Sequence, residues 1–241
     1  MRAFAVTKSW VLALSALVAL AVPAGAGPWP REPGAHFLSV SVDRDRDGNQ
    51  YSALYGEYGL TPRYTLGYEL GHSNAGESSA IFWLQRAMGR GDGANRLSMS
   101  VGVGAIRRDD ETLPVGQVVS GWGRGFDGIW DGGWITAELK MKVTARSKDD
   151  PVVTQAAGTL AALTPEFSTK ADLTLGLRRN SSLMIINQLR LEKPQDEDLT
   201  ASLASSIVRD LVGSTKIELG VVTPISGPVE PAVRLGTWLE F

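Results

Sequence analysis

Apolar and polar residues alternate one by one along most of the chain. In residues 170–178, for example, Leu173, Leu175 and Leu177 each follow a polar or small residue. A period of two is typical of a β-strand with one apolar and one polar face. The pattern predicts twelve strands, near residues 36–43, 51–61, 64–73, 79–89, 95–107, 115–123, 134–145, 168–178, 182–192, 198–209, 214–222 and 231–241.

The connections between these strands alternate in length. Those after odd-numbered strands are polar and mostly long, as in 43–50 and 146–167, whereas several of the others, such as 61–63 and 179–181, are tight. The connection 124–133 departs from this rule. Transmembrane barrels have short periplasmic turns and longer external loops. We therefore predict an all-β, antiparallel up-and-down transmembrane β-barrel with both chain ends in the periplasm.

A soluble exported β-protein that binds a partner is the alternative fold, because sandwiches and lipocalin-like barrels also alternate. Their polar face, however, points outward to water. Beyond residue 26, no apolar run approaches the roughly 18 residues of a membrane-spanning helix. Helical membrane spans are therefore excluded.

The first 26 residues have the features of a secretory signal peptide. Arg2 and Lys8 are basic, residues 10–22 are apolar, and Ala24 and Ala26 are the small residues that a signal peptidase reads. The apolar run of 13 residues is too short for a membrane anchor, which needs about 20. We expect cleavage after Ala26.

The rest of the chain, residues 27–241, is expected to form one outer-membrane β-barrel domain. Its first stretch, 27–34 (GPWPREPG), is predicted to be an extended periplasmic lead-in rather than a strand, because proline cannot donate a hydrogen bond to a ladder.

Composition narrows the possible functions. The chain has no cysteine, which excludes disulfides and an acylated N-terminal cysteine, and only two histidines, which leaves few catalytic arrangements. No basic stretch suggests nucleic acid as a partner. The loop 43–50 (DRDRDGNQ) has a calcium-like spacing of aspartates, but Arg44 and Arg46 interrupt it and no bidentate glutamate follows. We assign no metal, no cofactor and no catalytic residue.

Charged side chains fall on the polar face of the strands, as a lipid-facing apolar surface requires. One reading is a selectivity lining for a pore, and the other is a network of ion pairs that fills a narrow lumen. Balanced charge favours the second reading, because it selects neither sign of ion. The candidate pore-lining residues are Glu57, Glu69, Glu138, Lys140, Lys142, Asp172, Arg178, Arg190, Lys216, Glu218, Arg234 and Glu240.

The last ten residues (AVRLGTWLEF) end on an aromatic, with apolar residues at alternate positions before it. This strand resembles the one by which bacterial outer-membrane β-barrel proteins are handed to the barrel-assembly machinery. The resemblance implies localisation in a Gram-negative outer membrane, with membrane lipid and that machinery as partners, and gives no oligomeric state. Thr237 departs from the pattern, and the matching positions are Val233, Leu235, Leu239 and Phe241.

An enzymatic alternative centres on His72 at the end of the third strand. The string Gly71–Gly76 (GHSNAG) is similar to the His-x-Ser-Asn pattern of outer-membrane lipid hydrolases, which act at the barrel rim. Here His72 and Ser73 are adjacent, so on a strand they point to opposite faces. Ser78 or Ser79, on the returning strand, can approach His72 instead.

Two further features have open interpretations. The sequence leaves three alternatives for residues 150–167: an external lid, a segment that folds into the lumen, or an extension of the neighbouring strands. Five aromatics are candidates for an interfacial belt: Tyr58, Tyr64, Tyr68, Phe82 and Trp134. Taken together, the sequence predicts a passive small-solute channel or a structural barrel with external loops.

Overall fold

The computed structural model describes residues 27–89, 93–108, 111–147, 163–228 and 230–241. Twelve strands form within these residues, as the alternation predicts. The strands are β1 (His36–Asp45), β2 (Gln50–Thr61), β3 (Tyr64–Ser73), β4 (Ser78–Met88), β5 (Asn95–Arg108), β6 (Glu111–Phe126), β7 (Gly133–Ser147), β8 (Leu163–Asn180), β9 (Leu183–Pro194), β10 (Thr200–Val212), β11 (Thr215–Ser226) and β12 (Ala232–Glu240).

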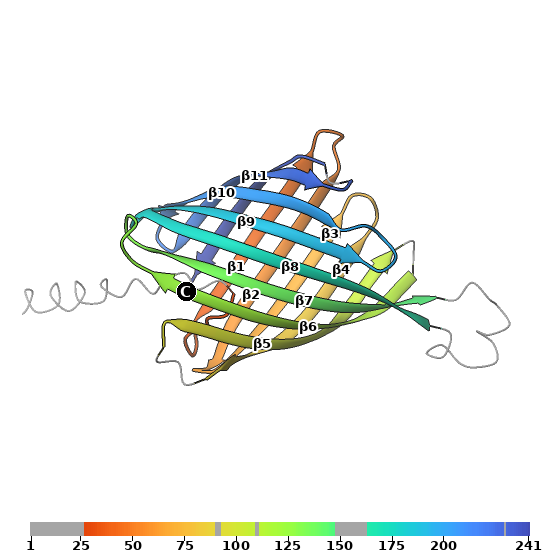
Figure 1. The fold of residues 1–241 in the computed structure, drawn as a ribbon, viewed down its shortest axis with the longest axis horizontal. Coiled ribbons are helices and arrows are strands. Elements are labelled where there is room, and N and C mark those ends of the chain that lie inside the picture. Colours follow the sequence, from red (N-terminus) through yellow and green to blue (C-terminus); the bar gives the residue numbers. More distant parts are fainter. Residues whose placement is uncertain (1–26, 90–92, 109–110, 148–162, 229) are drawn as a thin grey trace, which may run out of the picture.

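Each strand pairs antiparallel with its neighbours in sequence, and β12 pairs with β1, so the sheet closes into a barrel (Figure 1). We call the end that carries His36 and Phe241 the inner end, and the end with the β1–β2 and β3–β4 loops the outer end. Closure leaves no unpaired edge strand. Within the described residues, no helix is long and apolar enough to cross a membrane.

The outward face of the barrel is apolar. Val101 and Val103, near the middle of β5, are 60% and 70% exposed, whereas Ser98 and Ser100 on the inward face are buried. A soluble β-fold would show the reverse arrangement, since its polar face meets water. The apolar outward face overturns the soluble alternative and suits hydrocarbon, where only closed barrels and helices satisfy their backbone groups.

Two strands are longer than the alternation predicts. β6 spans Glu111–Phe126 rather than 115–123, and β8 spans Leu163–Asn180 rather than 168–178. The glycines that weaken the β6 pattern lie beside the N-terminal segment. A Cβ on Gly123 would lie 2.5 Å from Pro28 Cγ, whereas one on Gly121 would lie 3.5 Å from Pro28 Cβ and 2.8 Å from Ser98 Oγ, a hydroxyl that can rotate away.

The segment predicted as a lid is partly strand. Residues 163–167 pair with the end of β7, from Ser147↔Leu163 to Val143↔Phe167, which supports strand extension for this part. Residues 148–162 lie outside the described residues, as does the predicted signal peptide, 1–26.

Trp134 does not belong to an outer aromatic belt. It is 5% exposed and packs inside the barrel with Met184 and Val208. It lies on the same face of β7 as the inward-facing Thr136, and the absence of a side chain on Gly176, its cross-strand partner, leaves room for the indole. The other four belt candidates alternate with inward-facing residues on β2, β3 and β4 and therefore face outward: Tyr58, Tyr64, Tyr68 and Phe82.

Candidate functional site in the barrel lumen

The twelve charged residues predicted on the polar face project from the inward face of the barrel. Nine of them line one of two lumen cavities: Glu69, Glu138, Lys140, Asp172, Arg178, Arg190, Glu218, Arg234 and Glu240. Glu57 and Lys216 contact inward-facing partners, and Lys142 shares a face with Lys140. Their role as a pore lining remains a prediction.

The N-terminal segment Gly27–Glu32 lies inside the inner end of the barrel, which corrects the expectation of a periplasmic lead-in. Pro28 is fully buried, and Trp29 packs against the cluster of Trp134, Met184 and Val208. The segment is not a strand, as its prolines predict. We call it the N-terminal plug segment.

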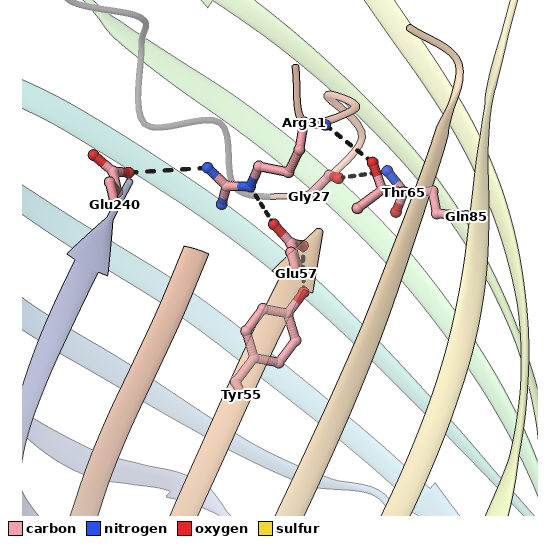
Figure 2. A network of polar contacts seen from close by, with 7 residues as sticks. All are labelled: Gly27, Arg31, Tyr55, Glu57, Thr65, Gln85 and Glu240. Atoms are coloured by element: carbon pink, nitrogen blue, oxygen red, sulfur yellow. Dashed lines mark hydrogen bonds and ion pairs between the residues drawn. The ribbon is translucent and has the colours of Figure 1, made fainter. Parts of the chain in front are cut away.

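Arg31 makes the main polar contacts of this segment. Its Nε donates to Glu57 Oε2, and its guanidinium lies 3.9 Å from Glu240 Oε1 (Figure 2). The backbone N–H of Arg31 donates to Thr65 Oγ1 at 3.0 Å, and Tyr55 donates to Glu57 Oε1 at 2.5 Å. The guanidinium also lies over the Phe37 ring, 4.5 Å from its centroid. A buried carboxylate and a buried guanidinium thus satisfy each other.

A cavity of about 690 Å³ occupies the lumen above the plug segment. It extends from Gly27 and Arg31 to Thr200 and Ala232, at the outer ends of β10 and β12. Its lining is mostly polar and charged. This region of the lumen is therefore a hydrophilic vestibule.

The charges of β7 and β8 are sorted into bands along the vestibule. Glu138 stands opposite Asp172 in the strand register, and Lys140 stands opposite Lys170. Like charges directly opposite each other destabilise a sheet. Lys170 is relieved by Glu192 at 2.8 Å, and Lys140 lies 3.9 Å from Glu69.

Elsewhere the lumen charges form ion pairs, as the second reading of the sequence expected. Asp43 accepts two hydrogen bonds from Arg234, at 2.7 and 2.6 Å, across the β1–β12 seam. Lys216 donates to Glu240 at 2.9 Å. The lumen therefore has ion pairs at the β1–β12 seam, like charges in register between β7 and β8, and opposite charges in register between β8 and β9.

Other predicted charges have neutral partners. Glu218 accepts from Trp238 Nε1 at 3.1 Å, Arg190 donates to Gln188, and the Arg178 guanidinium lies 5.1 Å from the centroid of Trp134.

A second cavity, of about 560 Å³, lies at the inner end. Asp127, Arg178 and Phe241 are among its lining residues. Among the described residues, Arg31 and Trp134 line both cavities. The plug segment and the Trp134 cluster therefore separate the vestibule from the inner mouth.

The structure brings Ser78, rather than Ser73, to His72. His72 Nδ1 and Ser78 Oγ are 2.9 Å apart on the outward face, at the outer ends of β3 and β4. Among the described residues, Ser78 is the hydrogen-bond partner recorded for the ring, so no carboxylate orients it. A nucleophile–base pair without such an orienting group is an incomplete catalytic arrangement.

The aspartate-rich loop folds on itself. Asp45 accepts hydrogen bonds from the backbone N–H and side-chain amide of Asn49, at 2.8 and 2.7 Å. Across the described parts of the chain, no group of three histidine or acidic residues is placed to hold a metal ion.

Sequence reasoning missed four charged lumen residues: Arg31, Asp43, Lys170 and Glu192. Asp43 lies on the polar face of the first strand, where alternation places it inward, but it also begins the aspartate-rich stretch 43–50 that predicts a loop. Arg31 carried a weaker signal, namely a charge and the aromatic Trp29 within a proline-rich stretch. Alternation could not place this segment, because it is not a strand.

The residues of the predicted assembly signal lie on the outward face of β12. Val233 and Leu235 are 62% and 52% exposed, and Leu239 shares their face. Phe241 is 69% exposed and exchanges two backbone hydrogen bonds with His36, at 2.6 and 3.1 Å. Recognition by the assembly machinery remains a prediction.

The fold has known counterparts. The sequence matches no family profile and no curated protein. In structure the chain is similar to the NanC porin, with a TM-score of 0.57 and 11% identity over 84% of this chain and 98% of that one. It is also similar to the KdgM porin, with a TM-score of 0.58 and 6% identity over 85% and 99% of the two chains. An outer-membrane channel from Pseudomonas putida F1 gives a TM-score of 0.55 and 13% identity, over 90% of this chain and 99% of that one. The fold is that of the outer-membrane β-barrels.

Proposed function

We propose that the protein is an outer-membrane channel for small hydrophilic solutes. The observation that carries this proposal is the banded charge on the vestibule wall, where Glu138 faces Asp172 and Lys140 faces Lys170. Between β8 and β9 the register pairs opposite charges, Asp172 with Arg190 and Lys170 with Glu192, so the like pairs between β7 and β8 are the ones that stability alone does not explain. Charges kept in bands beside a cavity are suited to guiding solutes past them.

The similar structures support this class of function. Two are described as porins and a third as an outer-membrane channel. The KdgM porin has also been solved in complex with disordered oligogalacturonate. We infer the same environment here, with the inner end in the periplasm and the outer loops at the cell surface.

We further propose that the chain is exported by its first 26 residues and cleaved after Ala26. The lumen position of Gly27 supports a new N-terminus at this residue, because its oxygen accepts a hydrogen bond from Gln85 at 3.1 Å inside the barrel. Intact mass of the protein purified from membranes tests this. A mass that retains residues 1–26 would contradict it.

Planar-bilayer conductance of the purified protein tests the channel. We expect discrete current steps whose reversal potential shifts toward cations in Lys140→Gln and toward anions in Glu138→Gln, because each change removes one charge from the lining. Glu77→Gln, which changes a charge at the outer rim paired with Arg108, is the control and leaves selectivity unchanged. A folded barrel that is silent in every variant, and also after the contacts of Arg31 with Glu57 are removed, would exclude the channel.

The contact between His72 and Ser78 keeps a rim lipid hydrolase as the second candidate. A phospholipid-hydrolysis assay on detergent-solubilised protein decides between the two functions. We expect no turnover, because no carboxylate among the described residues is seen to orient the pair. Turnover by the natural protein that disappears in both His72→Ala and Ser78→Ala would establish the enzyme.

A further inference from the structure

We propose that the N-terminal plug segment, Gly27–Glu32, is a releasable plug that closes the channel at its inner end, and that Arg31 is its latch. This inference concerns regulation of the proposed channel and rests on that function. The plug lies between the vestibule and the inner cavity, which share only Arg31 and Trp134 among their described lining residues. A solute that crosses the barrel must therefore displace it.

The latch holds the plug to three strands. Arg31 binds Glu57 on β2 and approaches Glu240 on β12, and its backbone N–H donates to Thr65 on β3 (Figure 2). Its side chain is 12% exposed and that of Glu57 is 5% exposed. Breaking this pair while both groups stay buried is costly. Opening therefore requires the whole segment to leave together.

The plug is separable from the barrel wall because it belongs to no strand. Pro28, Pro30 and Pro33 lack the N–H that a ladder needs. The backbone joins the sheet at Gly34, whose N–H donates to Gly59 O at 2.8 Å and whose φ is +84°. Gly34 is therefore a suitable hinge, and all twelve strands remain paired when the plug moves.

Gly27, at the far end of the plug, acquires a positive charge when residues 1–26 are removed. Hydrolysis of the Ala26–Gly27 amide bond leaves a carboxylate on Ala26 and an ammonium on Gly27. A Cβ built on Gly27 would lie 3.2 Å from Glu138 Oε1, so in the folded barrel the ammonium of Gly27 lies near this carboxylate. Glu138 also faces Asp172, and a cation here relieves that like-charge pair. Export processing thus favours the closed state.

A disulfide lock tests the plug. A Cβ on Gly121 would lie 3.5 Å from Pro28 Cβ, which is within the range of disulfide-bonded cysteines. The natural chain has no cysteine, so Pro28→Cys with Gly121→Cys gives one possible bond. The two single-cysteine variants are the controls. We expect the double variant to cross-link internally, as seen by mass and by loss of free thiol.

The disulfide lock is then combined with substitutions that remove the contacts of Arg31. Arg31→Ala with Glu57→Gln removes the ion pair without leaving a buried charge, and we expect a several-fold rise in bilayer conductance. In that background the oxidised lock abolishes the rise and reduction by dithiothreitol restores it. Heat-modifiable gel migration confirms that each variant folds.

The other outcomes are distinguishable. Failure of the cross-link to form would overturn the position of the plug. A cross-link that forms without changing measurable currents would overturn its gating role. A cross-link in a barrel that stays silent even with the latch broken would overturn the channel itself.

The proposed contact between the Gly27 ammonium and Glu138 is tested separately, without measuring conductance. Glu138→Gln removes the carboxylate beside Gly27 and is expected to lower the cross-link yield. Glu69→Gln, which removes a carboxylate in the vestibule away from the plug, is the control. Equal yields in the two variants would remove this part of the inference.

Discussion

At the scale of single residues, the plug depends on a glycine in the wall. A Cβ on Gly59 would lie 1.9 Å from the carbonyl oxygen of Glu32 and 2.9 Å from that of Arg31. Both neighbours are backbone atoms, which cannot rotate away as a side chain can. Gly59 is therefore required for close approach rather than for an unusual backbone angle.

Gly59→Ala is expected to expel the plug without altering any charge. The measurement is the yield of the Pro28→Cys/Gly121→Cys cross-link, which should fall, together with bilayer conductance, which should rise. Gly125→Ala is the matched control, because the atom nearest to its added Cβ is 3.9 Å away. Unchanged cross-linking in Gly59→Ala would show that the plug is seated elsewhere.

At the scale of one strand, the outward residues of β5 and β10 show how the cost of a charge depends on its depth in the lipid. Val101 lies near the middle of β5 and is 60% exposed, so the environment of its side chain is hydrocarbon. We expect Val101→Arg to lower the free energy of unfolding from lipid vesicles by about 2–4 kcal/mol. Val212→Arg, at the inner end of β10, should cost about 0–1 kcal/mol. Urea titration measures both, and equal losses would contradict this orientation in the membrane.

At the end of the last strand, the effect of Phe241 on assembly in the cell can be measured separately from its effect on the stability of the folded barrel. Phe241 is 69% exposed, so its side chain buries little surface in the folded protein. If the strand is an assembly signal, removing Phe241 lowers the amount of heat-modifiable barrel in isolated membranes and leaves refolding in detergent largely intact. Equal loss in both measurements would assign Phe241 to structural closure instead, through its two hydrogen bonds with His36.

At the scale of the whole molecule, closure depends on the β1–β12 seam. The bidentate pair of Asp43 and Arg234 spans this seam, and the two side chains are 19% and 21% exposed. Bidentate charged hydrogen bonds are among the stronger polar contacts. The pair joins residues 191 positions apart in sequence, so it forms only when the barrel closes.

Asp43→Ala is expected to lower the free energy of unfolding by about 1.5–3 kcal/mol, because Arg234 loses its partner inside the lumen. Glu192→Ala is the control. It breaks the more exposed pair with Lys170, which should contribute about 0–1 kcal/mol. Adding Arg234→Ala to Asp43→Ala should recover part of the loss. Equal effects of the two single changes would show that the seam pair has no special role.

The sequence by itself determined the strands, their order and the direction of most side chains. A strand has a period of two whatever its neighbours are, so alternation alone placed Glu138 and Lys140 inward and Val101 outward. Alternation also identified an even number of strands, and the apolar outward face then demands a closed barrel, because lipid offers no partners to a free edge.

Only the tertiary structure decided what fills the lumen. The plug has no period, since its prolines keep it out of the sheet, and its contacts depend on residues far along the chain. Arg31 meets Glu57 and Glu240, and Trp29 meets Trp134, because the closed barrel brings four distant segments to one end. Local pattern fixes the direction of a side chain, whereas its partner depends on how the whole sheet curves and closes.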